Sequence, residues 1–176
     1  MIDQAYGEFA DDYNDPVRTF ELVDRGNTVV TRSFSKAYGL AGIRVGWGYF
    51  PKELATQIRK VLSPNNISVT AQVMATAAMR DQKHMRSIVH RTIEIRERFA
   101  DECRALGLVV HKRQNKFVLL RIPSSEIAAE ADRQLRAHKL ALRGMGPYGL
   151  AECLRATICR QDIMDRCLQV LKEVVR

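Results

Sequence analysis

Apolar residues along the chain alternate between helical and extended spacing. Where they recur every three or four positions, or where alanine is abundant, the sequence predicts helices at residues 17–23, 52–62, 68–79, 82–106, 126–137 and 163–174. Short runs of β-branched and other apolar residues predict strands at 28–30, 45–50, 108–110, 117–120, 140–142 and 153–158. Strands that alternate with helices predict an α/β protein, whose second part, from residue 107, forms a small α+β unit.

Size and charge set broad limits on the class of protein. The 176 residues suffice for one domain or two small ones, and 46% of them are hydrophobic, enough to build a core. The formal net charge of +8 permits binding to anions such as phosphorylated metabolites or nucleic acid. However, the basic helix predicted at 82–106 interleaves acidic residues and has no line of aromatic residues on which bases could stack. We therefore expect no nucleic-acid partner.

The cysteines and the N-terminus indicate a compartment. Four cysteines occur without any C-x-x-C pair: Cys103, Cys153, Cys159 and Cys167. No metal site is expected from them, and because three lie in apolar segments, buried thiols in a reduced, cytoplasmic chain are favoured. Asp3 and Glu8 interrupt any apolar stretch at the N-terminus, so no signal peptide is expected. The longest uncharged run, 61–79, is too polar to span a membrane.

The candidate chemistry centres on residues 31–47, which read TRSFSKAYGLAGIRVGW. Lys36 stands on a loop that leaves a predicted strand, where α/β folds place their chemistry. Its amine can form a Schiff base with an aldehyde cofactor. Ser33, Ser35 and Arg44 can hold a phosphate of that cofactor through hydroxyl contacts and a forked, charge-assisted pair. The alternative is a surface lysine in a glycine-rich loop.

This segment resembles the lysine segment of the class II pyridoxal-phosphate (PLP) aminotransferases of fold type I, most nearly those of the histidinol-phosphate type. Near the N-terminus, Asp3-Gln4-Ala5-Tyr6 resembles the D-E-A-Y segment of the same family. The resemblance implies that Lys36 is the catalytic lysine, that Asp3 faces the ring nitrogen of PLP and that Tyr6 contacts its phenolic oxygen. Gln4 departs from the usual glutamate, which is not the ring partner in the family.

A second motif lies at 154–158, which reads LRATI and predicts a strand with one arginine among apolar neighbours. Such an arginine needs an anionic partner. The motif resembles L-R-x-T-I, whose arginine holds the anionic end of the substrate. The resemblance implies that Arg155 binds the carboxylate of glutamate and the phosphate of a histidinol-phosphate-like partner, and that Arg143 adds to this pocket. A structural salt bridge is the alternative for both arginines.

Two positions depart from the family pattern around Arg155. Cys159 follows the strand where the family has glycine, so a side chain there strains the turn if the backbone φ is positive. Lys116 precedes the strand phenylalanine where the family tends to have asparagine, and Asn115 lies one position earlier.

The resemblance runs almost from end to end of this chain, but it covers only the C-terminal half of a typical family member. It implies the C-terminal part of the PLP-binding large domain at 1–80, a long connecting helix at 81–106 and a small C-terminal domain at 107–176. We therefore expect an incomplete chain that works as a homodimer or with a partner chain supplying the missing half.

The function that the resemblance implies is a cytoplasmic, PLP-dependent transaminase of histidine biosynthesis. It would move an amino group between glutamate or 2-oxoglutarate and a substrate of the imidazole-acetol-phosphate or histidinol-phosphate type. Lys36 would serve as general base and acid. Three alternatives remain open: a PLP-dependent amino-acid-phosphate decarboxylase, an aromatic aminotransferase and a non-catalytic fragment.

Overall fold

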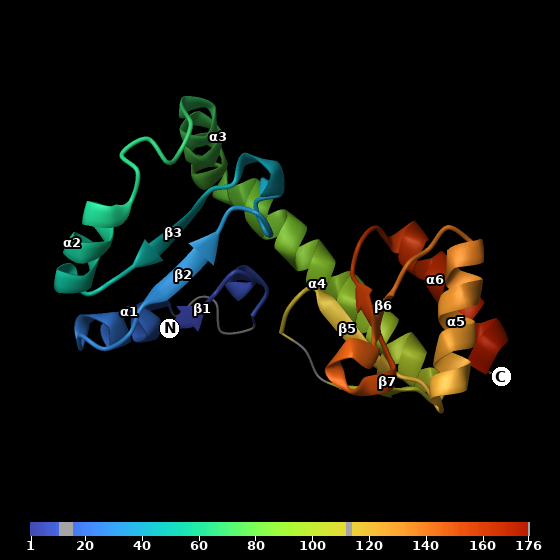
Figure 1. The fold of residues 1–176 in the computed structure, drawn as a ribbon. Coiled ribbons are helices and arrows are strands. Elements are labelled where there is room, and N and C mark those ends of the chain that lie inside the picture. The colour runs from blue at the N-terminus through green and yellow to red at the C-terminus, as the bar shows by residue number, and fades with distance from the viewer. Residues whose placement is uncertain (11–15, 112–113, 176) are drawn as a thin grey trace. The chain divides into compact units, whose positions relative to one another are not determined.

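The computed structural model of the chain describes residues 1–10, 16–111 and 114–175 (Figure 1). It divides into two compact units, Met1–Val89 and His90–Arg176. The finer division into parts at 1–80, 81–106 and 107–176 stays a prediction.

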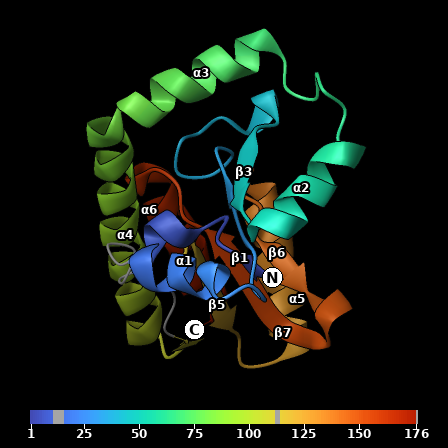
Figure 2. The same ribbon diagram turned by 90° about the vertical axis from the view of Figure 1, so that its left-hand side faces the viewer.

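The first unit contains a three-stranded sheet with the order β1-β2-β3 (Figures 1 and 2). Its strands are β1 (Ile2–Asp3), β2 (Val30–Ser33) and β3 (Gly46–Tyr49). β1 runs parallel to β2, with Asp3 opposite Thr31, and β3 runs antiparallel to β2. The strand predicted at 28–30 therefore begins later and continues into the lysine segment.

The helices of the first unit lie where the apolar spacing predicts helices, one before β2 and two after β3. The first unit has α1 (Pro16–Asp24), α2 (Lys52–Val61) and α3 (Val69–Arg80), with single turns η1 (Gly7–Phe9) and η2 (Ala41–Ile43). α1 lies against β2 (Figure 2). Pro51 occupies the position before α2, and Ser68 caps α3 by accepting a hydrogen bond from the Ala71 amide at 3.2 Å. α4 (Gln82–Ala105) begins in this unit and continues into the second.

The second unit is built on a four-stranded antiparallel sheet with the order β4-β5-β7-β6. The strands are β4 (Val109–Val110), β5 (Phe117–Arg121), β6 (Arg143–Met145) and β7 (Leu150–Thr157). The helices are α5 (Ser125–Ala137) and α6 (Gln161–Val175), and the single turn η3 (Gly146–Tyr148) joins β6 to β7. α5 packs against both α6 and β7. This arrangement has the α+β character predicted for the C-terminal part of the chain.

The strand predicted at 140–142 is wrong. Lys139 adopts a positive φ of 59°, and the Leu140 amide donates back to the carbonyl of Leu135 at 2.8 Å, so these residues close the end of α5. Leu140 and Leu142 are apolar because they are buried in the core, each 8% exposed. Pairing with β7 begins only at Arg143.

The core of the second unit lies between the sheet and its helices. Fully buried residues from several elements meet there: Cys103, Leu120, Ala131, Leu135 and Leu171. Cys103, Cys153 and Cys167 are buried as expected, whereas Cys159 is exposed. Burial raises the pKa of the Cys103 and Cys167 thiols to about 12, so both stay protonated at neutral pH.

The expected strain at Cys159 is not found. Among the described residues, Arg44 and Lys139 are the non-glycine residues with positive φ, so Cys159 is accommodated without left-handed backbone. Within the part of the chain that the structure describes, no helix combines the length and the apolar character needed to cross a lipid bilayer.

Candidate active site

Lys36 lies in the loop after β2, and this loop is anchored on both sides. Phe34 and Ala37 are 6% and 4% exposed, and Phe34 packs in a small core cluster with Val45 and two alanines of α3. The intervening Lys36 side chain is half-buried. Anchored neighbours restrict the positions that the amine can reach, which is what a catalytic lysine requires.

Tyr6 lies in the turn that follows β1, and its ring lies close to this lysine. Because β1 and β2 are parallel neighbours, the residues after their carboxyl ends lie at the same edge of the sheet. The Lys36 Nζ atom lies 5.1 Å from the centroid of the Tyr6 ring. The structure thus brings together two candidate residues that are far apart in the sequence.

Asp3 is held at the end of β1 by two hydrogen bonds to its Oδ1 atom. The Ala5 amide donates at 2.9 Å, and the Thr31 hydroxyl of the neighbouring strand donates at 3.5 Å. The side chain remains exposed. Gln4 has a different role, since its Oε1 atom accepts from Arg32 Nε at 3.0 Å and from Nη2 at 2.8 Å. The carboxylate expected to face a ring nitrogen is therefore Asp3, and Gln4 is engaged elsewhere.

Ser33, Ser35 and Arg44 gather around one turn. The Ser33 hydroxyl accepts from the Ser35 amide at 3.0 Å, and Arg44 Nη1 lies 3.4 Å from the Ser35 hydroxyl. Arg44 also donates to the Ala41 carbonyl at 2.8 Å, and its φ of 54° places it in the left-handed region. Such backbone persists in a non-glycine residue only where its surroundings over-determine it.

The donor set of this turn fits a phosphate. Two hydroxyls and a guanidinium converge, and none of the ion pairs between described residues involves Arg44 or Lys36. A site with several donors, a net positive charge and no carboxylate matches the chemistry of a phosphate group.

Arg143 and Arg155 form a second candidate site in the other unit. They lie directly opposite each other on β6 and β7, an arrangement that is unfavourable for like charges unless an anion offsets it. The Nε atom of Arg155 is buried without a hydrogen-bond partner among the described residues. Arg143 Nη2 donates to the Tyr148 hydroxyl at 2.7 Å. None of the ion pairs within the described ranges uses either arginine, which argues against the salt-bridge alternative.

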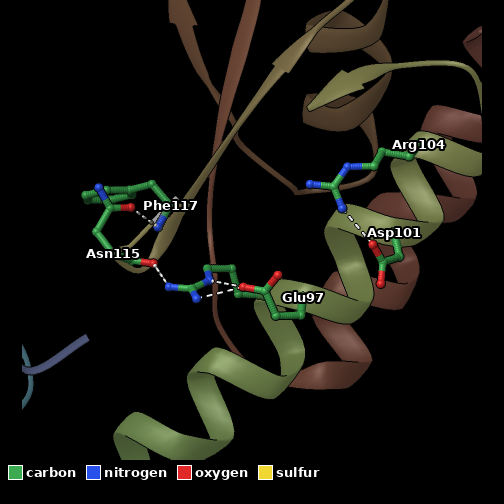
Figure 3. A network of polar contacts seen from close by, with 6 residues as sticks. Glu97, Asp101, Arg104, Asn115 and Phe117 are labelled. Carbon is green, nitrogen blue, oxygen red and sulfur yellow. Dashed lines mark hydrogen bonds and ion pairs between the residues drawn. The ribbon is translucent and has the colours of Figure 1, made fainter. Parts of the chain in front are cut away.

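Arg96 is a residue that the sequence did not single out. It belongs to the long run of charges in α4, and no local pattern separates it from the exposed arginines of that helix. Its side chain is nevertheless buried, with 3% of the residue exposed. Figure 3 shows its partners Glu97 and Asn115, together with Phe117 at the start of β5.

Glu8 is the other buried charged residue among those described, in η1 near the candidate lysine site. Its Oε2 atom has no partner within the described residues. Burial raises the pKa of this carboxyl above its ordinary value of 4.5, while a backbone hydrogen bond and then the charge of Arg32 lower it by less. The folded state therefore binds the Glu8 proton more tightly than the unfolded chain does.

This burial predicts a pH dependence of the stability of the first unit. With a raised folded pKa, stability is greatest below the unfolded value, falls as pH rises through the folded pKa and stays lower above it. Glu8→Gln removes this loss, so the stability of the variant relative to the wild type should rise as the pH increases from the unfolded pKa of the Glu8 carboxyl through its raised folded pKa. Denaturant unfolding followed by the fluorescence of Trp47, the single tryptophan, measures the difference. Parallel pH profiles for the two proteins would contradict the prediction.

The sequence and the structure have recognisable relatives. The chain belongs to the family Aminotransferase class I and II, which matches residues 1–171. A histidinol-phosphate aminotransferase of Rhodospirillum centenum is 41% identical over 161 residues, covering 90% of this chain and 44% of the relative. Its counterpart from Jannaschia sp. is 37% identical over 175 residues, covering 99% of this chain and 48% of the relative. The chain thus spans about half the length of the curated relatives it matches.

The fold of this chain is also similar to that of a solved aminotransferase structure. The structure of histidinol-phosphate aminotransferase from Sinorhizobium meliloti in complex with pyridoxal-5'-phosphate matches with a TM-score of 0.85 and 28% identity, over 99% of this chain and 48% of that chain. The predicted fold class, part of a fold-type I large domain followed by a small α+β domain, is confirmed. The resemblance to the C-terminal half of histidinol-phosphate aminotransferases is confirmed as well. The roles assigned to individual site residues stay predictions.

Proposed function

We propose that this protein is a PLP-dependent transaminase. It moves an amino group between glutamate or 2-oxoglutarate and a substrate of the imidazole-acetol-phosphate or histidinol-phosphate type. The observation that carries the proposal is the lysine site: an anchored Lys36 whose amine lies against Tyr6, beside a turn of hydroxyls and a guanidinium. The names of the relatives, at up to 41% identity, support this choice of reaction.

The residues of the lysine site fit the parts of pyridoxal phosphate one by one. Ser33, Ser35 and Arg44 would hold its phosphate, Asp3 its ring nitrogen and Tyr6 its phenolic oxygen. When bound, the cofactor would supply an aldehyde that reacts with amines and a ring that accepts electrons from the α-carbon of the substrate.

Lys36 has two tasks in this proposal. Its amine would hold the cofactor at rest, and during turnover the same amine would take the proton from the α-carbon of the substrate as general base and later give it back as general acid. The Tyr6 ring lies against the amine, and the buried neighbours Phe34 and Ala37 hold the backbone that carries it. A base that is already positioned is efficient because little further entropy is lost in bringing it to the substrate during the reaction.

Arg155 and Arg143 would recognise the anionic ends of the substrates. A carboxylate or phosphate between them would relieve the repulsion of the two facing guanidinium groups and give the buried Arg155 Nε an acceptor. Both glutamate and a phosphorylated amino alcohol carry such a group. One arginine pair can therefore serve both halves of the reaction.

We further propose that the active site is completed by an assembly, either a homodimer or a partner chain that supplies the half of the relatives not spanned here. Exposed apolar residues support such a contact: Val61 of α2 and Val69 and Val73 of α3 are 84%, 77% and 64% exposed. The proposed partners are small-molecule substrates and protein subunits, and the proposed compartment is the cytoplasm.

Covalent labelling tests the lysine site without any need for turnover. The chain is mixed with PLP, reduced with borohydride and digested, and the pyridoxyl group is located by mass spectrometry. We expect the label on Lys36, an absorbance band that survives dialysis, and loss of both in Lys36→Ala. Lys60→Ala, which removes an exposed lysine of α2, is the matched control and should label normally. Equal labelling of Lys36→Ala and the wild type would overturn the proposed site.

A further inference from the structure

We infer that Arg96 is a positioning residue: it fixes Asn115 in the turn before β5 and thereby the Phe117 ring on which Arg155 lies. Arg96 does not belong to the lysine site or to the Arg143–Arg155 site. The inference rests on the proposed anion-binding role of Arg155, and it explains why a charged residue of α4 is buried.

The guanidinium of Arg96 is buried and contacts the turn before β5. Two of its nitrogens, Nε and Nη2, each lie 2.7 Å from Oε1 of Glu97, and Nη1 donates to the carbonyl of Asn115 at 2.9 Å. The side chain of Glu97 is 55% exposed, whereas that of Arg96 is 4% exposed. An ion pair between neighbours on a helix forms equally well at the surface, so it does not account for the burial. The contact that requires a buried guanidinium is the one to the Asn115 carbonyl.

Asn115 forms a turn through its side chain. Its side-chain Oδ1 atom accepts from the Phe117 amide at 2.9 Å, which closes a tight turn immediately before β5 (Figure 3). Figure 3 shows the carbonyl of Asn115 directed toward the helix while its side chain is directed toward Phe117. Arg96 therefore holds the backbone of the residue whose side chain sets the first position of the strand. Lys116 is fixed as well, because its carbonyl accepts from Ile158 at 2.9 Å.

Phe117 connects this turn to Arg155. The Phe117 ring lies beneath the guanidinium, with its centroid 4.3 Å from Arg155 Cζ. At this distance the ring attracts the cation and sets the plane of the guanidinium. Phe117 pairs with Thr157, two positions along β7 from Arg155. A displaced Asn115 would shift the ring and leave the guanidinium without its support.

The consequence concerns anion affinity. A guanidinium held flat on a ring presents its fork in one orientation, so less rotamer entropy is lost when a carboxylate or phosphate binds. Without Arg96, the Phe117 ring loses its fixed position and Arg155 samples more orientations. We expect weaker binding of anions rather than loss of the fold.

The test uses the full chain, with inorganic phosphate as the probe and NMR detection of the Arg155 Nε–Hε signal. In the wild type, the ring current of Phe117 should displace this signal, and phosphate should shift it saturably. In Arg96→Gln the ring-current displacement should shrink, and the phosphate affinity should fall about tenfold. Arg96→Lys, which keeps a charged donor for the Asn115 carbonyl, should recover most of the affinity.

Two controls make the outcomes separable. Arg104→Gln removes an arginine of the same helix that pairs with Asp101 (Figure 3), and it should leave both signals unchanged. Phe117→Leu removes the aromatic ring but keeps an apolar residue in the strand, so it should lower the phosphate affinity as Arg96→Gln does. This variant keeps the inference testable if Arg96→Gln does not fold. Wild-type affinity in a folded Arg96→Gln or in Phe117→Leu would overturn the inference. A wild-type Arg155 Nε–Hε signal that phosphate does not shift would instead overturn the proposed anion site, and the inference with it.

Discussion

Replacing Lys36 by alanine is expected to lower the rate constant for transamination, kcat, by about ten-thousandfold in the assembly that completes the site. The physical reason is that the proposed base is the Lys36 amine, which lies 5.1 Å from the centroid of the Tyr6 ring. Without it, the proton on the substrate α-carbon has no positioned acceptor. Lys36→Arg should be nearly as impaired, because a guanidinium keeps the charge but does not act as a base near neutral pH.

The measurement is the formation of 2-oxoglutarate from glutamate, followed with a coupled assay. Small amines such as methylamine should restore part of the rate in Lys36→Ala, because they supply a base in the space that the side chain vacates. They should not accelerate the Lys60→Ala control. A Lys36→Ala variant that retains more than about a hundredth of the wild-type kcat would argue that another residue transfers the proton.

Much of the lysine site could be predicted from the sequence because it is nearly contiguous. Ser33, Ser35, Lys36 and Arg44 fall within one segment, and the structure brings the two serines and the arginine around one turn. The proximity of Tyr6 depends on the parallel pairing of β1 with β2. β1 has only two residues, too few for a hydrophobic period, so a physical reading of the sequence could not establish that pairing; the resemblance to the family pointed to it.

The second unit shows where apolar patterning misleads. Leu140 and Leu142 look like a strand because they are apolar, yet they fill the core at the end of α5. The segment that pairs with β7 is Arg143–Met145. It has little apolar character, and it forms a strand because its backbone pairs with β7. The same register places Arg143 opposite Arg155. Sequence spacing alone does not contain this information.

Arg96 was missed for a related reason. Burial of a charged residue in an otherwise exposed helix depends on a partner from a distant turn, here the carbonyl of Asn115. A backbone carbonyl leaves no signature in the sequence. The departure at Lys116 and Asn115 was visible, and the structure accounts for it, because Asn115 makes the turn before β5 from one position earlier.

Replacing Arg155 by methionine is expected to raise the KM for the phosphorylated substrate and for glutamate by about a hundredfold, equivalent to about 2.7 kcal/mol. Methionine keeps the apolar stem on Phe117 but removes the fork, including the buried Nε atom that lacks a partner among the described residues. Arg143→Met should have a smaller effect, because Arg143 is exposed and its guanidinium is already engaged by the Tyr148 hydroxyl.

Steady-state kinetics separate this role from a catalytic one. If Arg155 only binds the anionic end, KM rises while kcat changes little, and covalent labelling of Lys36 by PLP is unaffected. Arg121→Met is the matched control, since Arg121 lies on β5 of the same sheet and its side chain, which pairs with Glu152, is 60% exposed. An Arg155→Met enzyme with an unchanged KM for both substrates would exclude the arginine pair as the anion site.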